Sequence, residues 1–180
     1  TPMGEFWIPG GAQTAYSCIE ASSIAHVMGR PVVGSEAFTS CNLFDTYPGA
    51  LKNQLDWALG IGINSFCFHT FAHQPLGDDV KPGMTFGPYG TTWNRNQAWW
   101  PMTESVHRYM ARCSHLLRQG VTVSDILYLT PEGAPHVFRP PQDATDGNQV
   151  WFPDKRGYAF DGCSPLLLSA REKVKDGKIV

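Results

Sequence analysis

The sequence predicts an α/β fold built around a parallel β-sheet that helices cover. Three observations carry this prediction. Segments with helical periodicity alternate with short apolar segments along most of the 180 residues, and such alternation is typical of βαβ units. The apolar segments are continuous, as expected for strands that are buried on both faces. Glycine and proline stand at the borders of most segments, where they start or end a helix.

Four segments have the apolar spacing of amphipathic helices, and residues typical of helix ends border them. Gly29 follows the first segment, where a C-terminal cap glycine is expected. Pro48 opens the second, and Ser164 with Pro165 opens the last as N-cap and first helical residue. The predicted helices are residues 12–29, 48–60, 102–119 and 164–174.

Short apolar segments between these helices are predicted to be buried strands. They are residues 31–39, 63–69 and 125–130. The first two run into polar residues at their carboxyl ends, which is where parallel α/β sheets place their ligands. Residues 76–100 are predicted as a long loop, and loops of this length inside a compact chain tend to be functional. Residues 131–160 are predicted to be irregular.

The number of predicted βα units limits the architecture. A complete (β/α)8 barrel needs roughly 250 residues, whereas the 180 residues hold only a few units. We therefore expect part of such a barrel. The pair Asp176-Gly177 is typical of a hairpin turn, and we expect the second strand of that hairpin to be missing. Because position 1 is not Met either, the chain is expected to be a segment of a longer protein.

Composition and charge exclude several classes of function. The formal net charge is −2 and 17% of the residues are charged, so the chain lacks the basic surface that nucleic-acid binding by charge requires. It has no run of about 18 apolar residues that could span a membrane. Its five cysteines form no CxxC pair, which argues against a zinc or redox motif of that type.

Two carboxylates are candidates for catalysis because of their positions. Glu5 is flanked by aromatic residues, and Glu36 lies at the polar end of a predicted strand. They are one βα unit apart, so neighbouring strands would present them side by side. Glycoside hydrolysis requires such a pair: one carboxyl group protonates the leaving oxygen, and the other activates water or attacks. The alternative is a terminal charge at Glu5 and a helix-cap carboxylate at Glu36.

Two histidines lie at the carboxyl end of the second predicted strand. His69 and His73 are four residues apart, but in a strand end and loop rather than a helix, and no Glu follows the first as in a zinc peptidase. We expect both to hydrogen-bond a polar ligand. Satisfied loop histidines are the alternative.

The loop at residues 83–100 is rich in side chains suited to sugar binding. Aromatic rings can stack on the C–H face of a sugar, and Asn and Arg can donate to its hydroxyls. The predicted contacts are Trp93, Asn94 and Arg95. The alternative is a loop that packs against the mouth of the barrel, which suits Trp99 and Trp100.

Four segments, taken in order along the chain, carry a family resemblance. They are Gly4–Trp7, Gly29–Thr39, Phe68–Pro75 and Pro82–Trp100. These segments resemble glycoside hydrolase family 106, the α-L-rhamnosidases. Several separate motifs in the right order make the resemblance more specific than one short pattern.

The resemblance implies that residues 1–122 are the later βα units of a (β/α)8 catalytic barrel. Residues 123–180 would hold the last strand and the start of a following α/β or β domain. It also implies inverting removal of terminal α-L-rhamnose from plant polysaccharides or glycosides, a calcium ion in the active site, and a periplasmic or secreted location in bacteria. Glu36 would then be a catalytic carboxylate acting as general base. Glu5 would be either catalytic or a calcium ligand, and a further carboxylate would lie upstream of Thr1.

Two classes of function remain open at this point. The first is a glycoside hydrolase segment that acts on rhamnosides, with the missing barrel strands supplied by the rest of the full-length chain. The second is a non-catalytic carbohydrate-binding or structural remnant. Another barrel glycosidase, such as a β-galactosidase-like enzyme, is a related alternative. The isolated 180 residues are expected to have little activity, because a few units leave two open sheet edges.

Overall fold

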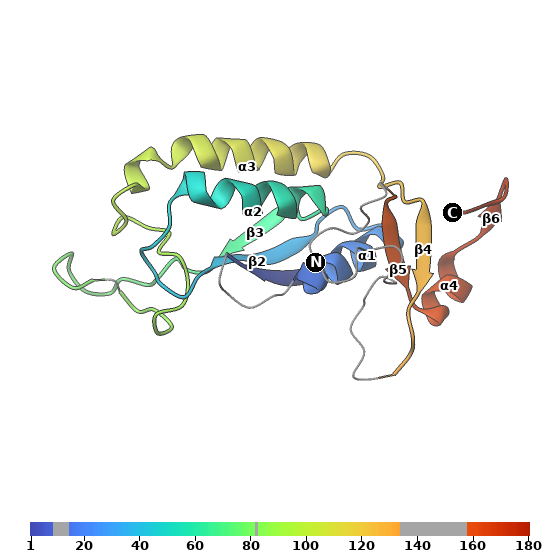
Figure 1. Cartoon of the computed structure of the whole chain (residues 1–180), viewed down its shortest axis with the longest axis horizontal. Coiled ribbons are helices and arrows are strands. Elements are labelled where there is room, and N and C mark those ends of the chain that lie inside the picture. Colours follow the sequence, from blue (N-terminus) through green and yellow to red (C-terminus); the bar gives the residue numbers. More distant parts are fainter. Residues whose placement is uncertain (9–14, 82, 134–157) are drawn as a thin grey trace.

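The computed structural model describes residues 1–8, 15–81, 83–133 and 158–180. Its first part alternates strands and helices (Figure 1). The elements are β1 (Met3–Trp7), α1 (Ala15–Val27), β2 (Gly34–Thr39), α2 (Pro48–Gly60) and β3 (Ser65–Phe68). A short 3-10 helix at Trp100–Met102 and the helix α3 (Glu104–Leu117) follow the long loop. The predicted alternation of helices and strands is therefore confirmed.

The strands β1, β2 and β3 form a parallel sheet in that order. Consecutive strands are neighbours, and a helix connects each pair, as in successive βαβ units. The described residues do not close this sheet into a barrel, because β1 and β3 are its two edges.

The helices α1, α2 and α3 all cover one face of this sheet. Gly4 faces α1, where a side chain at this position would lie 2.7 Å from the backbone of Ser17 and Cys18. Phe6, two residues further on the same face, packs edge-on against Trp57 of α2 with ring centroids 5.8 Å apart. In Figure 1, α2 and α3 run side by side over the sheet. Alternate residues of the strands therefore point away from these helices.

A large apolar core lies between the sheet and the helices. Leu51, Leu55 and Leu59 are buried, as the spacing of leucines in the second predicted helix indicates. The core also includes Phe6, Val33, Phe38, Ile63, Trp93, Trp99 and Met110. The predicted apolar stripe of α3 is buried only in part, because Met110 is buried whereas Leu116 and Leu117 are exposed.

A bulge near the end of β2 turns one aromatic side chain into this core. The register between β1 and β2 shifts after Glu5, and Phe38 has a φ of +64°. Its ring stacks on Phe68 and Trp93 at centroid distances of 5.8 and 5.7 Å. Bulges re-aim side chains in this way. A left-handed conformation at a bulky residue costs about 1–3 kcal/mol, and such strain clusters at functional sites.

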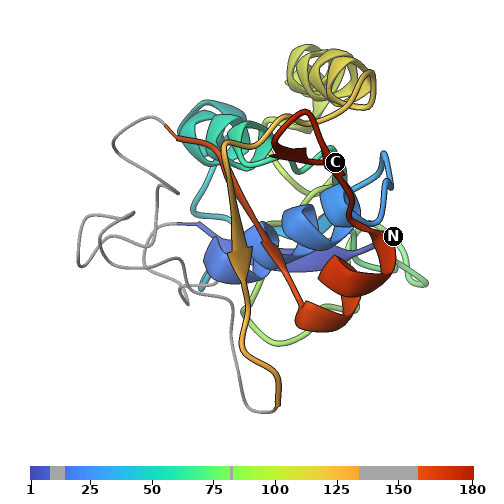
Figure 2. The same ribbon diagram turned by 90° about the vertical axis from the view of Figure 1, so that its right-hand side faces the viewer.

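The C-terminal part forms a second, smaller parallel sheet. β4 (Ile126–Leu129) pairs with β5 (Phe160–Cys163) and not with β3. Figure 2 shows this pair side by side in front of α1. Residues 131–160 were predicted to be irregular, so β5, which begins at Phe160, is a strand that sequence analysis missed. Most of that segment, residues 134–157, lies outside the described residues.

The last elements are a short helix and a hairpin. In α4 (Pro165–Arg171), the Ser164 hydroxyl accepts a hydrogen bond from the Leu167 amide, so the predicted N-cap is confirmed. β6 (Val174–Lys175) and β7 (Lys178–Ile179) pair antiparallel around Asp176-Gly177. The expectation that this hairpin lacks its second strand was wrong, because Lys178–Ile179 follows the turn and pairs with Val174–Lys175.

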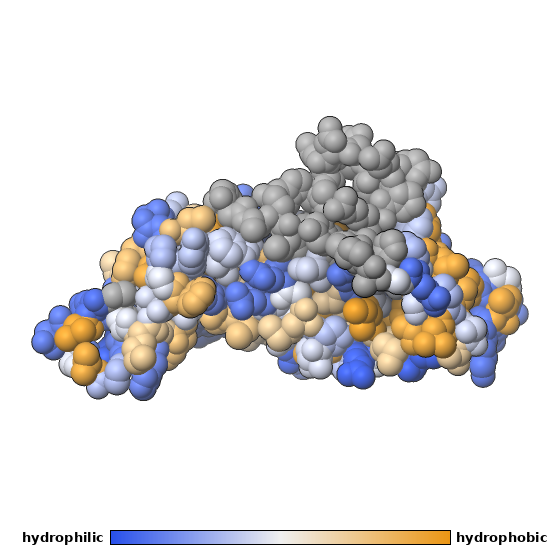
Figure 3. Space-filling model, turned by 90° about the horizontal axis from the view of Figure 1, so that it is seen from below, coloured by the Kyte–Doolittle hydropathy of each residue, from blue (hydrophilic) through white to orange (hydrophobic). Residues whose placement is uncertain are grey.

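Exposed apolar side chains lie at several places on the surface. Figure 3 shows some of them at the tip of the long loop and around the C-terminal elements. Those of the loop are Leu76, Val80, Met84, Phe86 and Tyr89. Among the described residues no helix is both long and apolar enough to cross a membrane.

Candidate active site

Glu5 and Glu36 lie next to each other on the face of the sheet that points away from the helices. The register of the parallel strands pairs Glu5 with Glu36, and Glu36 with Cys67 of β3. Paired residues of neighbouring strands point to the same face. Gly4 faces α1, so this row faces the other way. The prediction that neighbouring strands present the two carboxylates side by side is therefore confirmed, whereas their roles stay predictions.

The Glu5 backbone is fixed by the first turn of α1. Its amide donates to the Ser17 hydroxyl at 3.0 Å, and the same hydroxyl donates back to the Glu5 carbonyl at 3.1 Å. The Cys18 thiol adds a contact to that carbonyl at 3.4 Å, and burial raises the pKa of this thiol. The close approach of α1 requires glycine at position 4.

The Glu5 carboxylate is held by the indole of Trp7. Trp7 Nε1 donates a hydrogen bond to Glu5 Oε1. The two residues are two positions apart in one strand, so they share a face. For Glu36, the described residues provide no hydrogen-bond partner to the side chain, which is half-buried. One carboxylate is therefore oriented, and the other is free to meet a ligand.

The loop at residues 83–100, called the aromatic loop from here on, contacts this site through Tyr89. The rings of Tyr89 and Trp7 pack edge-on with centroids 5.8 Å apart. The next residues are anchored at the carboxyl ends of the strands: the Gly90 amide donates to the Ser40 carbonyl at 2.8 Å, and the Thr91 amide to the His69 carbonyl at 2.7 Å. Gly90 has a φ of +114°, and a side chain there would lie 2.9 Å from His69 Nδ1.

Four buried polar atoms around these carboxyl ends have no hydrogen-bond partner within the described part of the chain. They are Thr39 Oγ1, His69 Nδ1, Thr92 Oγ1 and Asn94 Nδ2. Thr39 and His69 stand at the ends of β2 and β3, and the amides of Gly90, Thr91 and Trp93 donate to carbonyls at these ends. The Thr92 amide donates to the Leu43 carbonyl. Buried polar groups require partners, so this cluster marks a place where ordered water or a polar ligand group would complete the bonding.

The two predicted histidines have different environments. His69 is half-buried at the end of β3, whereas His73 is exposed and its carbonyl accepts from the Met84 amide at 2.9 Å. The His73 backbone therefore connects the segment before the long loop to Met84 within it. Contact of either histidine with a sugar stays a prediction.

The three predicted sugar contacts of the loop are placed unequally. Trp93 is 2% exposed and its indole donates to His107 Nε2 at 2.8 Å, so its ring has no free face for stacking. Burial lowers the pKa of His107, which favours the neutral ring that this bond requires. Asn94 is buried, and its Oδ1 accepts from the Asn96 amide at 2.9 Å. Arg95 is exposed and pairs with Asp78 at 2.8 Å.

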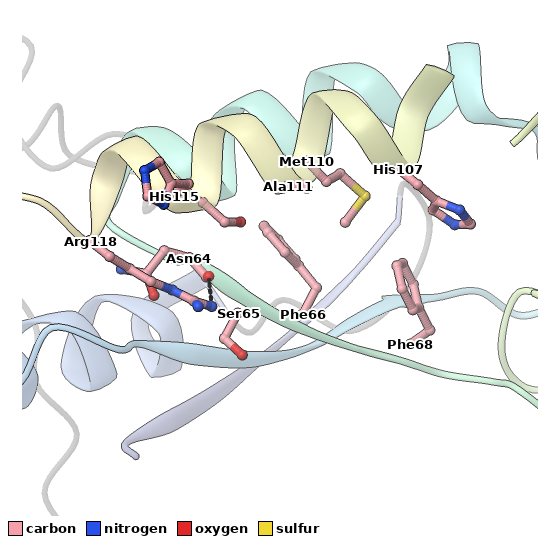
Figure 4. Close-up of a pocket in the computed structure, with 10 residues that line it drawn as sticks. Asn64, Ser65, Phe66, Phe68, His107, Met110, Ala111, His115 and Arg118 are labelled. Carbon is pink, nitrogen blue, oxygen red and sulfur yellow. Dashed lines mark hydrogen bonds between the residues drawn. The ribbon is translucent and has the colours of Figure 1, made fainter. Parts of the chain in front are cut away.

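A groove of about 420 Å³ lies on the opposite face of the sheet. Phe66 and Phe68 of β3 point toward Met110 of α3, with His107 at one end of the groove and Arg118 at the other (Figure 4). Arg118 Nη2 donates to the Asn64 carbonyl at 2.6 Å. No carboxylate lines this groove, so it cannot supply the paired acid chemistry predicted from the sequence.

A second polar cluster attaches the small sheet to α1. Asp161 is buried, and its carboxylate accepts from Ser124 Oγ at 2.6 Å and pairs with His26 Nδ1 at 2.8 Å. Ser23 Oγ also accepts from the Gly162 amide at 3.0 Å. The serine contacts the carboxylate and not the imidazole, so this is not a nucleophile with its base.

The described residues do not supply all the oxygen ligands that a calcium ion needs. Calcium takes six to eight oxygen ligands, and no group of three or more His, Cys, Asp or Glu side chains converges anywhere in the described chain. One Glu5 oxygen is already bonded to Trp7. The described residues thus do not by themselves fit a calcium site.

Comparisons with known proteins agree with the resemblance noted in the sequence. The family model of glycoside hydrolase family 106, described as alpha-L-rhamnosidase, matches residues 1–180. A Formosa agariphila protein that carries the provisional name beta-glucuronidase is 41% identical over 134 residues, 74% of this chain and 11% of that protein. The rhamnosidase from Novosphingobium sp. PP1Y superposes with a TM-score of 0.81 at 28% identity, over 99% of this chain and 17% of that one. The chain thus spans less than a fifth of the length of these relatives.

Proposed function

Because the chain belongs to glycoside hydrolase family 106, we propose that it is a catalytic segment of an enzyme that removes terminal α-L-rhamnosyl groups from plant polysaccharides or glycosides. The observation that carries this proposal is the row of Glu5 and Glu36 on the open face of the sheet. A non-catalytic remnant would have no need for two carboxylates in register beside an aromatic loop.

In this proposal, Glu36 is the general base that activates water, and the reaction inverts the anomeric carbon. The side chain has no partner in the described part of the chain, which leaves its oxygens available for water. The acid and base of inverting enzymes are separated by roughly 6.5–9.5 Å. Because the family resemblance implies a further carboxylate, we propose that the acid partner of Glu36 lies elsewhere in the longer protein. Glu5 then acts as a second carboxylate of the site, either in the reaction itself or as a ligand of a calcium ion.

The sugar would lie across the carboxyl ends of the strands. The unpartnered polar atoms of Thr39, His69, Thr92 and Asn94 support this placement. Arg95 and His73 are exposed and could reach a more distant sugar unit. Trp93 contributes by packing beneath the loop, where its burial supports a role in shaping the site.

The remaining expectations from the family are also proposals. We propose that residues 1–122 form later units of a (β/α)8 barrel, and that residues 123–180 begin the next part of the protein; the separate β4–β5 sheet supports this division. Glu5 is proposed to contribute one oxygen to a calcium ion, whose other ligands would come from parts of the protein beyond the described residues.

A second candidate activity follows from one relative. The Formosa agariphila protein is named as a beta-glucuronidase, so cleavage of a β-glucuronide is the alternative to be tested against α-L-rhamnoside cleavage. Both reactions require a pair of carboxylates, so it is the family match and the superposition on a rhamnosidase that favour the rhamnoside.

Hydrolysis of nitrophenyl glycosides by the full-length protein tests the proposed function. We expect release of nitrophenol from the α-L-rhamnoside and at least about 100-fold lower kcat/KM for the β-D-glucuronide and β-D-galactoside, a difference of about 2.7 kcal/mol in barrier. Preference for the glucuronide would replace the proposed substrate. Absence of hydrolysis, with rhamnose binding retained in calorimetry, would support the non-catalytic alternative.

A further inference from the structure

We propose that Trp7 is a positioning residue for the Glu5 carboxylate, and that Tyr89 of the aromatic loop holds Trp7 in place. This inference rests on the proposed function, because it assigns a role within the same site. Neither residue was predicted from the sequence to belong to the site.

The contact between Trp7 and Glu5 fixes a side chain that would otherwise be mobile. A glutamate has three rotatable side-chain bonds, whereas its backbone here is already held by Ser17. The indole N–H donates to one carboxylate oxygen, which leaves the second oxygen free to face a ligand. A hydrogen bond to a charged group is stronger than one between neutral groups, so a single donor suffices to select one orientation.

Tyr89 limits the movement of the indole from the other side. Its ring packs edge-on against Trp7, a geometry that aromatic pairs prefer. Tyr89 stands directly before Gly90, whose amide and carbonyl are both bonded to Ser40 at 2.8 and 2.9 Å. The position of Tyr89 is therefore set by the end of β2, the strand that carries Glu36.

This arrangement links the two carboxylates through the loop. Glu36 lies on β2, β2 holds Gly90 through Ser40, and Tyr89 then contacts Trp7, which bonds Glu5. Tyr89 therefore connects the strand that carries Glu36 to the indole that orients Glu5.

A double-mutant cycle in the full-length protein tests whether Trp7 acts through Glu5. Trp7→Phe keeps a ring for Tyr89 to contact but removes the N–H donor. We expect it to lower kcat about 10-fold with KM changed less than twofold, since loss of a hydrogen bond to a charged group has effects of this order. In a Glu5→Gln background the same substitution should change kcat less than twofold. The hydrogen bond that Trp7→Phe removes would there orient an amide and not a carboxylate.

Tyr89 provides a second test that does not depend on the folding of the strand. Tyr89→Phe keeps the ring and should retain more than half of kcat, whereas Tyr89→Ala should lower kcat about threefold to tenfold. Phe86→Ala, in an exposed part of the same loop, is the matched control and should have no effect.

Three results would overturn the inference. They are an unchanged kcat in Trp7→Phe, an equal loss in both backgrounds of the cycle, and full activity of Glu5→Gln. Each requires a wild-type enzyme that hydrolyses rhamnosides, so each is distinguishable from failure of the proposed function, in which the wild-type protein itself is inactive on them.

Discussion

The two faces of the three-stranded sheet are built from alternate residues of the same strands. They differ in polarity and in whether helices cover them. The face toward α1, α2 and α3 carries Gly4, Phe6 and Phe66 and is packed with apolar side chains. The opposite face carries Glu5, Glu36 and Cys67 in one row. A period of two along each strand thus separates the residues that hold the fold from the residues of the proposed site. Changes on the first face should affect stability, and changes on the second should affect activity.

The largest effect on stability is expected on the helix-covered face. Phe38 is 1% exposed and contacts Phe6, Phe66, Phe68 and Trp93. Phe38→Ala should destabilise this part of the protein by about 3–5 kcal/mol through loss of burial and the cavity left behind. Urea unfolding followed by tryptophan fluorescence measures this loss. Phe86→Ala, at an exposed position of the loop, should leave the midpoint of urea unfolding unchanged. Equal shifts of the midpoint in Phe38→Ala and Phe86→Ala would contradict the proposed difference between the two faces.

The next largest effect on stability is expected where the small sheet contacts α1. Asp161→Ala removes the shared acceptor of His26 and Ser124 and leaves both without that partner. We expect a cost of about 1–3 kcal/mol, visible as faster hydrogen exchange in the peptides of β4 and β5. Asp79→Ala, at an exposed position of the loop, is the control. Unchanged exchange in Asp161→Ala would show that apolar contacts such as Phe160 with Tyr128 hold the small sheet alone.

The His107 contact should make the helix-covered face sensitive to acid. In the folded protein, burial lowers the pKa of His107 below its ordinary value. The unfolded state therefore binds the proton more readily than the folded state. The contribution of this residue to stability is therefore present above about pH 6.5 and is lost as the pH falls below that value. Protection of the α3 amides, corrected for intrinsic exchange rates, should decrease between pH 7.5 and 5.5. The decrease should be smaller in His107→Gln; an identical pH dependence would contradict this account.

The smallest effect is expected at the surface of the loop. Arg95 and Asp78 are both exposed, and exposed ion pairs contribute about 0–1 kcal/mol. Arg95→Ala should leave the unfolding midpoint within error of the wild-type value. A rise in KM for longer rhamnosides, with stability unchanged, would support the proposed contact with a distant sugar unit.

Much of the fold could be predicted because its pattern is local. Helical spacing of leucines and the residues at helix ends sufficed for α2 and α4. The strand β5 could not be found this way, because Phe160–Cys163 contains Asp and Gly rather than a continuous apolar run. Its strand conformation depends on pairing with β4 and on packing against α1, which are contacts between residues far apart in the chain.

The candidate site shows the same limit. The adjacency of Glu5 and Glu36 follows from one βα unit between them and could be predicted. Trp7 could also have been found, since residues two apart in a strand share a face. The contact with Tyr89 could not, because it joins segments about eighty residues apart through a loop without periodicity. Burial of Trp93 likewise depends on Phe38, which a bulge turns into the core.

The central claim is that the open face carries out the chemistry, and Glu36→Gln in the full-length protein tests it most directly. The carboxylate has no partner within the described residues, so its loss should leave the unfolding midpoint unchanged. We predict a fall in kcat on nitrophenyl α-L-rhamnoside of at least about 1,000-fold, equivalent to about 4 kcal/mol of barrier. Glu104→Gln, which makes the same change at an exposed position of α3, should alter kcat less than twofold. A loss of only about threefold in Glu36→Gln would contradict the assignment of catalysis to this face.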